Sequence, residues 1–495
     1  MKAEVLQLDR RIGILLAVLC GLAIGVFIYA AAHPPLLTGY DFEAFWCGAK
    51  ALLQHASPYT NEPLHACEAT TSPAFFLRYP QVTVPVPLPG YAIALFTPFA
   101  LIPFALARIV WLILQVFCAL VIGRGIAKLS GMPPLTALAA SGLAVLGPAL
   151  LQGALSPIPI ALTVCAALAL RRKQWNAATI LLGFAMVEPH MVLPACVAVF
   201  LTIPQMRIRL LAAGAGAAAV MLAVLGPQIA LSYFTTVLPL HAASEVNNLG
   251  QLSLTALLYH LGAAPALALR LGSLQYVLLA LLGVFAARAL YLKQDDRSWL
   301  VLLPAAFAVT GGAFIHLDEV AMAVPLACVI VMRRPNPFSM LALLMLAMPV
   351  ASILDWFPLS VPAAMLCVWL MARPEFPLRR VIANGILPAA TALVVVGGAF
   401  ALHSVAAEHA QQAVTYIVNL VDPGGTANAS ATWFAYNSLA QITPLWWAQE
   451  AWTLLPLAIL VTLSVRESLA GDAGGAEWKR LGGAPGTWNR TGSRP

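Results

Sequence analysis

This sequence contains few charged residues. Only 9% of its 495 residues are Asp, Glu, Lys or Arg, whereas 61% are hydrophobic, and the mean hydropathy is +0.85. A soluble protein carries roughly 25% charged residues. The composition therefore excludes an ordinary soluble enzyme and predicts an all-α polytopic membrane protein.

Several short motifs are also missing. The sequence contains no Walker A loop, no GxSxG elbow and no HExxH helix, so neither ATP-driven transport nor soluble-type hydrolase chemistry has support. Its eight cysteines include no CxxC pair. Cys47 and Cys67 share the first predicted outer loop, where they either form a disulfide in an oxidising compartment or stay as two free thiols.

Basic residues recur in small clusters between apolar runs. The net charge of +7 therefore indicates membrane topology and not nucleic-acid binding. By the positive-inside rule we predict a multi-pass membrane protein with cytoplasmic N- and C-termini. The first apolar run, Ile12–Ala32, is too long for a signal-peptide core and is expected to remain as a helix. The clusters include Arg10-Arg11, Arg124 with Lys128, Arg171-Arg172-Lys173, Arg207 with Arg209, Arg288 with Lys293, Arg333-Arg334 and Arg379-Arg380.

The alternation of apolar runs and basic clusters predicts about 12–14 transmembrane helices in one domain, residues 1–466. Long outer loops are expected at 33–90, 227–262 and 403–450, and the Gly-rich tail 467–495 is expected to be a disordered cytoplasmic segment. A transporter usually places its site at mid-membrane on broken helices. Here the polar residues concentrate at the outer face, so we expect the site there.

The first outer loop contains a stretch, Tyr40–Leu53, with helical periodicity. Its apolar stripe comprises Phe42, Phe45, Ala49, Leu52 and Leu53, which predicts a helix lying in the membrane interface. Asp41 stands at the start of this helix. It serves either as a helix N-cap or as a general base held near the bilayer surface, and the two roles are compatible.

Other ionisable residues lie at the predicted outer ends of spans. Placing a charged side chain there is energetically costly, so such residues are candidates for a functional role. Glu188 and His190 are at a hairpin tip, which is either a solvated turn or part of an inner cavity. Arg78 and Arg270 are candidates for binding a phosphate or a lipid headgroup. The outer-face set also contains Glu43, Lys50, Glu62, Glu68, His241, Glu245, His316, Asp318, Glu319 and Asp355.

The segment His316-Leu317-Asp318-Glu319 heads another span. It is either an interfacial polar cap, a phosphate-binding histidine or a pair of metal ligands. One such group without partner ligands is a weak metal signal, so we expect no cofactor. In the second outer loop, Asn247, Asn248, Gln251 and Ser253 either bind sugar hydroxyls or form an ordinary polar loop.

A family resemblance follows from these residues. The first outer loop carries the pattern Asp41-Phe42, Phe45-Trp46, Ala49, Ala51-Leu52-Leu53 and Ser57-Pro58-Tyr59. This pattern resembles the first-loop signature of glycosyltransferase family 87, which includes polyprenyl-phosphate-mannose-dependent mannosyltransferases. Further similar segments come in the family's order: Tyr79-Pro80, Leu95–Pro103, Gly183–Pro189, Asn248–Leu254 and His316–Pro325. Two positions depart from the family pattern: the hairpin Lys is Glu188, and the second Pro of Tyr-Pro-Pro is Gln81.

The resemblance implies a GT-C fold, a polyprenyl-phosphate sugar donor, a lipid or glycan acceptor, and inversion at the anomeric carbon, with mannose as a candidate sugar. It assigns the role of catalytic base to Asp41. The expected donor-phosphate ligands are Arg78, His190, Arg270 and His316. The expected sugar or acceptor ligands are Glu43, Trp46, Tyr79, Glu188, Asn248, Gln251, Asp318 and Glu319, with no metal.

The sequence leaves two other functions open. A non-enzymatic transporter or flippase of a lipid-linked sugar would use a similar cavity. A structural subunit of an envelope complex would neither cleave nor move such a lipid.

Overall fold

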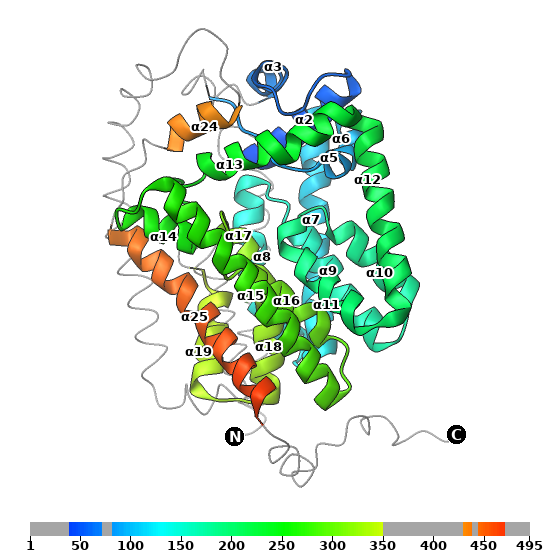
Figure 1. Cartoon of the computed structure of the whole chain (residues 1–495), viewed down its shortest axis with the longest axis vertical. Coiled ribbons are helices and arrows are strands. Elements are labelled where there is room, and N and C mark those ends of the chain that lie inside the picture. Colours follow the sequence, from blue (N-terminus) through cyan, green and yellow to red (C-terminus); the bar gives the residue numbers. More distant parts are fainter. Residues whose placement is uncertain (1–38, 72–81, 350–428, 438–443, 471–495) are drawn as a thin grey trace, which may run out of the picture.

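The computed structural model describes residues 39–71, 82–349, 429–437 and 444–470, and these residues form a helical body (Figure 1). Within them the backbone has no strand, only an isolated bridge between Gln251 and His316. In chain order the helices are α2 (Tyr40–Leu53), α3 (Asn61–Thr71), α5 (Gly90–Ala94), α6 (Thr97–Ala100), α7 (Phe104–Ser130), α8 (Pro134–Gln152), α9 (Pro157–Arg171), α10 (Trp175–Ala185), α11 (Pro189–Thr202), α12 (Pro204–Ser232), the π-helix η1 (Tyr233–Val237), α13 (Leu238–Ser244), α14 (Leu254–His260), α15 (Pro265–Gln294), α16 (Trp299–Ala308), α17 (Leu317–Val320), the 3₁₀-helix η2 (Ala321–Ala323), α18 (Val324–Arg333), α19 (Pro337–Ala347), α24 (Ala429–Asn437) and α25 (Pro444–Leu469).

Four helical segments of the described part are long and apolar enough to cross a membrane: Phe104–Ser130, Pro204–Ser244, Pro265–Gln294 and Trp446–Leu469. Shorter apolar helices, among them α9, α10, α11, α16 and α19, accompany them. The prediction of an all-α polytopic membrane protein is confirmed. The predicted first span, Arg78, Tyr79, Asp355, the spans near residues 361–401 and most of the third outer loop lie outside the described residues.

Gly and Pro set the ends and bends of the long helices. α7 starts directly after Pro103 and stops at Gly131, whose φ of 79° an L side chain rarely adopts. The long segment Pro204–Ser244 bends at Gly226, where φ is 72°, and Pro227 follows without an N–H to continue the ladder. The chain continues as helix beyond this bend. Residues 227–262, which hydropathy assigns to an outer loop, are therefore largely helical.

Helix α2 forms with the bounds that its periodicity predicts, but it is buried on nearly every side. Phe42 packs in an aromatic cluster, with its ring centroid 4.9 Å from that of Trp111. A disulfide joins Cys47 to Cys67 and ties α2 to α3, which decides between the two alternatives for these thiols. The N-cap of α2 is Gly39 and no side chain caps it, so Asp41 does not serve as the N-cap.

Close approach of α2 to α8 depends on Gly153. Its φ is 76°, and a Cβ built there would lie 2.8 Å from Cβ of Phe42. The carbonyl of Gly153 accepts a hydrogen bond from Nε1 of Trp111 at 2.9 Å. The close packing of Phe42 against Gly153 therefore helps to fix the position of its neighbour Asp41.

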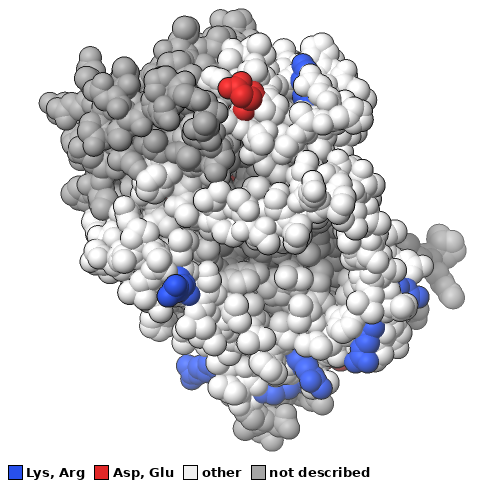
Figure 2. All heavy atoms as spheres, turned by 45° about the horizontal axis from the view of Figure 1, so that its top comes forward, with Lys and Arg blue, Asp and Glu red and all other residues white. Residues whose placement is uncertain are grey.

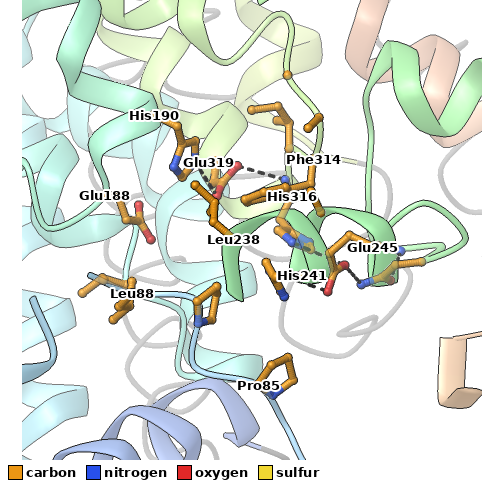
Figure 3. Close-up of a pocket in the computed structure, with 18 of the residues that line it drawn as sticks. Pro85, Leu88, Glu188, His190, Leu238, His241, Glu245, Phe314, His316 and Glu319 are labelled. Atoms are coloured by element: carbon orange, nitrogen blue, oxygen red, sulfur yellow. Dashed lines mark hydrogen bonds and ion pairs between the residues drawn. The ribbon is translucent and has the colours of Figure 1, made fainter. Parts of the chain in front are cut away.

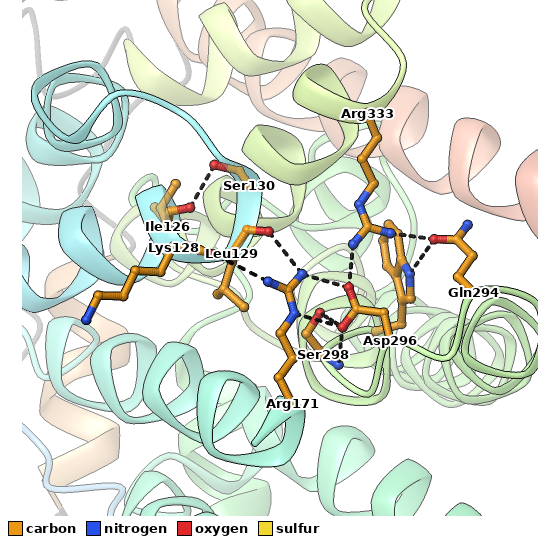
Figure 4. A network of polar contacts seen from close by, with 10 residues as sticks. Ile126, Lys128, Leu129, Ser130, Arg171, Gln294, Asp296, Ser298 and Arg333 are labelled. Atoms are coloured by element: carbon orange, nitrogen blue, oxygen red, sulfur yellow. Dashed lines mark hydrogen bonds and ion pairs between the residues drawn. The ribbon is translucent and has the colours of Figure 1, made fainter. Parts of the chain in front are cut away.

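At the end of the helical body away from α2 and α3, basic side chains converge on Asp296 (Figures 1 and 4). Arg171 at the end of α9 donates two hydrogen bonds to this carboxylate, at 2.8 and 2.6 Å, and Arg333 at the end of α18 donates a third. Burial raises the pKa of Asp296, but the two guanidinium groups lower it well below its usual range overall. The carboxylate of Asp296, which follows the end of α15, thereby joins the ends of α9 and α18 to that of α15.

Candidate active site

One cavity of about 810 Å³ lies between α2, the loop of residues 82–89, and helices α11, α13, α15 and α24 (Figure 3). Its volume falls in the range of roughly 300–1,000 Å³ that small-molecule sites occupy. Five carboxyl groups and three imidazoles line it: Asp41, Glu188, Glu245, Asp318, Glu319, His190, His241 and His316.

The loop of residues 82–89 closes one wall of this cavity. Tyr59 donates its hydroxyl hydrogen to the carbonyl of Leu88 at 2.9 Å, and Tyr233 donates to the carbonyl of Pro87 at 2.9 Å. The amide of Val84 donates to Oε2 of the buried Glu68 at 3.1 Å. Because three prolines restrict this loop and remove donors, side chains from other elements fix its position.

Glu319 holds two of the histidine residues in place. Its Oε1 lies 2.9 Å from Nε2 of His190, and its Oε2 accepts a hydrogen bond from the amide of His316 at 3.1 Å. Burial raises the pKa of Glu319, but the adjacent His190 and His316 lower it overall. Glu319 is therefore an ionised carboxylate that links α11 to the start of α17.

Glu245 is a second buried carboxylate of the cavity that contacts histidine residues. Nε1 of Trp433 and Nδ2 of Asn248 each donate to its carboxylate at 2.6 Å. Nε2 of His316 lies 3.7 Å away and Nε2 of His241 lies 3.9 Å away. These contacts orient a carboxylate that is only 1% exposed.

The carboxylates favour the charged form of His316. Burial alone lowers the pKa of this imidazole, but the charges of Glu245 and Glu319 raise it, and Asp318 and Asp41 add to the effect. The overall shift is upward. The surroundings of His316 therefore favour a positive charge at the cavity wall.

Asp41 faces the same cavity from the first turn of α2. Burial raises its pKa well above the usual range, the nearby Asp318 raises it further, and His316 opposes the shift. Burial, with Glu319, also raises the pKa of Asp318 to about 6. A carboxyl group whose pKa is closer to neutrality is a better proton acceptor from a hydroxyl group.

No Lys or Arg is among the described residues that line the cavity. Arg270, a predicted phosphate ligand, is exposed on α15 and does not line it. Arg78 and Tyr79 lie outside the described residues. Among the imidazoles of the described cavity lining, that of His316 has surroundings that favour its charged form.

Three predicted sugar or acceptor ligands do not line the cavity. Glu43 is buried and accepts the hydroxyl of Thr71. Trp46 donates its Nε1 hydrogen to the carbonyl of Phe99 at 2.8 Å. Gln251 is buried and donates to the carbonyl of Glu245 at 2.8 Å. These side chains hold α2 and the Glu245 segment in place.

Seven of the predicted site residues do line the cavity: Asp41, Glu188, His190, Asn248, His316, Asp318 and Glu319. Sequence reasoning put His241 and Glu245 at the outer face without a role. It missed Trp433 and Tyr276, because nothing local marks an aromatic residue in an apolar helix as part of a site. Tyr276 donates to the carbonyl of His190 at 2.8 Å. Among the described residues, no three His, Cys, Asp or Glu side chains are arranged to hold a metal ion.

The fold and the cavity define a helical membrane protein with a buried polar site. Residues 89–311 match the model of glycosyltransferase family 87, the same family that the motifs resemble, and this match supports the prediction of a glycosyltransferase. The match includes Glu188, His190 and Glu245, and it begins after Asp41 and ends before His316. No curated protein and no solved structure matches the chain.

Proposed function

We propose that the protein transfers a sugar from a polyprenyl-phosphate donor to a hydroxyl group of a lipid or glycan acceptor at the periplasmic face of a bacterial inner membrane. The reaction inverts the anomeric carbon. One observation carries this proposal: Asp41 and the His316 imidazole face the same cavity of about 810 Å³. A proton acceptor and a cation are the two groups that this reaction needs.

The roles follow from the geometry. His316 and His190, each held by a buried carboxylate, bind the donor phosphate. Asp41 takes the proton from the acceptor hydroxyl, whose oxygen attacks the anomeric carbon from the side opposite the phosphate. The bond from that carbon to the phosphate oxygen breaks, and its electron pair leaves with the lipid phosphate. Positioning and positive charge contribute most to the rate, because a phosphate is already a fair leaving group.

The apolar side of the cavity supports a lipid-linked donor. Leu193, Phe234 and Val277 line the cavity and are also 46%, 57% and 50% exposed. An apolar path therefore runs from the surface of the helical body to the polar groups. In the view of Figure 2 the surface is hollowed across an uncharged middle band, while most Lys and Arg side chains lie toward one margin. A polyprenyl chain suits such a path because it needs no hydrogen bonds.

Asp41→Asn tests the proposal. We expect transfer to fall by about 10²- to 10⁴-fold, since a general base contributes about that factor. The assay offers the purified protein, in lipid nanodiscs, a radiolabelled polyprenyl-phosphate sugar and a membrane extract, and measures free polyprenyl phosphate. Asp295→Asn, which changes an Asp side chain that does not line the cavity, is the control. Turnover of Asp41→Asn at the rate of the unmodified protein would show that Asp41 is not the base.

The same assay separates the enzyme from a transporter or flippase, which would use the same apolar path. Release of free polyprenyl phosphate supports the enzyme. Movement of the intact lipid across a vesicle membrane without cleavage indicates the transporter.

A further inference from the structure

Glu188 is a buried carboxyl group that faces the cavity and has an unsatisfied oxygen. It precedes α11 directly and is 8% exposed. Its Oε2 is buried and has no hydrogen-bond partner. Figure 3 shows its carboxyl group on the side of the cavity away from Glu245. A buried polar oxygen without a partner is rare in proteins and suggests that a ligand completes the site.

Two of the other carboxylates of the cavity, Glu319 and Glu245, already have partners. Glu319 interacts with His190 and with the amide of His316, and Glu245 accepts hydrogen bonds from Trp433 and Asn248. Glu188 differs, because the charged groups that act on it are other carboxyls. Burial raises its pKa, and Glu319, Asp318 and Asp41 raise it further.

Several carboxyl groups therefore lie close together in the cavity, and no described Lys or Arg lines it to stabilise their charged forms. Burying an unpaired carboxylate is costly, so a neutral ligand would leave Glu188 either protonated or unpaired. A ligand that carries its own positive charge would pair with it.

The position of Glu188 in the cavity indicates which part of the donor its carboxyl group faces. In the proposed reaction the phosphate lies at His316 and His190, and the acceptor hydroxyl lies at Asp41. The donor sugar must then occupy the space between them. Glu188 directly precedes α11, two residues before His190, and it lines the same cavity as Asp41 and Glu319, whose charges act on it. Its carboxyl group therefore faces the sugar.

We propose that the donor sugar is an amino sugar with a free amine, and that Glu188 binds its ammonium group; this inference rests on the proposed function. The amine takes no part in the chemistry. The new bond forms from the acceptor oxygen to the anomeric carbon, the phosphate leaves, and the ammonium group is retained in the product. Mannose, the sugar that the family resemblance implies, would leave the carboxyl group without a cation.

The test compares three polyprenyl phosphates, which carry an amino sugar, the same sugar N-acetylated, and mannose. We expect the unmodified protein to prefer the amino sugar. Glu188→Gln should lower kcat/KM for that donor by about 10- to 100-fold, the contribution of a hydrogen bond between charged groups, and should leave the other two donors unaffected. Glu188→Asp should keep the preference. Glu62→Gln, which changes an exposed Glu, should change nothing.

An equal loss with all three donors, or no preference in the unmodified protein, would overturn the inference. So would a preference that follows an amine on the acceptor. Binding of each donor is also measured by thermal stabilisation, which separates the two proposals. If no donor is cleaved, the proposed function fails, while an amine preference in binding that Glu188→Gln removes still supports this assignment. If mannose is transferred and bound as well as the amino sugar, the assignment to Glu188 fails and the proposed function stands.

Discussion

Replacing Asp296 by Asn is expected to destabilise the end of the helical body away from the cavity (Figure 4). The carboxylate accepts hydrogen bonds from Arg171, Arg333 and Ser298. Its side chain is 14% exposed, and those of the two arginines are each 25% exposed. Asn keeps the size of the side chain and removes its charge, so two partly buried guanidinium groups lose their counterion.

The magnitude follows from this burial. Removing one partner of a fully buried ion pair costs about 3–5 kcal/mol, and partial exposure of the arginines reduces the cost to about 2–4 kcal/mol. An unfolding entropy of about 2.1 cal/mol/K per residue sums to about 1 kcal/mol/K for this chain. The midpoint of thermal unfolding should therefore fall by about 2–4 °C.

Thermal unfolding of the purified protein, followed by intrinsic fluorescence in one detergent, measures the effect. Asp295→Asn is the matched control, because Asp295 is 83% exposed and its nearest contact to Arg297 is 3.8 Å. We expect the control to shift the midpoint by less than about 0.5 °C, as for a surface pair.

The effect of Asp296 should also depend on pH. The pKa of this carboxyl is lowered in the folded protein, so its stabilisation is present above the ordinary Asp pKa and is lost as the pH falls toward the folded pKa. The difference between Asp296→Asn and the unmodified protein should therefore shrink below about pH 4. Equal shifts for the Asp295 and Asp296 variants at neutral pH would refute the reasoning.

Two further predictions concern the cavity. Gly153→Ala should destabilise the protein by about 1–3 kcal/mol more than Gly131→Ala. Both glycines have a positive φ, but only at Gly153 would a Cβ meet Phe42. Equal midpoints of thermal unfolding for the two variants would contradict this prediction. Glu245→Gln should move the alkaline limb of the kcat/KM profile to lower pH, because the Glu245 charge raises the pKa of His316 and the imidazolium persists only below that pKa. An unmoved limb would show that His316 does not act as a cation in the reaction.

Local sequence patterns predicted much of the helical body. Alternating apolar runs and basic clusters indicated a helical membrane protein, and the periodicity of Tyr40–Leu53 predicted α2 with the bounds that it has. The hairpin of α10 and α11 also formed where short apolar runs flank Glu188 and His190. These features depend on residues close in sequence, so a single chain reveals them.

The surroundings of α2 were not predictable in the same way. A helical stripe shows which side chains share a face, but not what covers the other faces. The sequence favoured an interfacial helix, whereas α3, α5, α6 and α7 bury it nearly all round. Burial turns Glu43 and Trp46 away from the cavity and leaves Asp41 facing it.

By itself, the sequence determined the class of protein and the helices, because hydropathy and periodicity are local properties. The tertiary structure decided which charges meet. Trp433 comes 188 residues after Glu245, yet its indole orients that carboxylate beside His316. Glu188 and Asp41 are also far apart in the chain, but both line one cavity, where the charge of Asp41 raises the pKa of Glu188. Electrostatic interactions depend on distance and burial, which are set only when distant segments pack together.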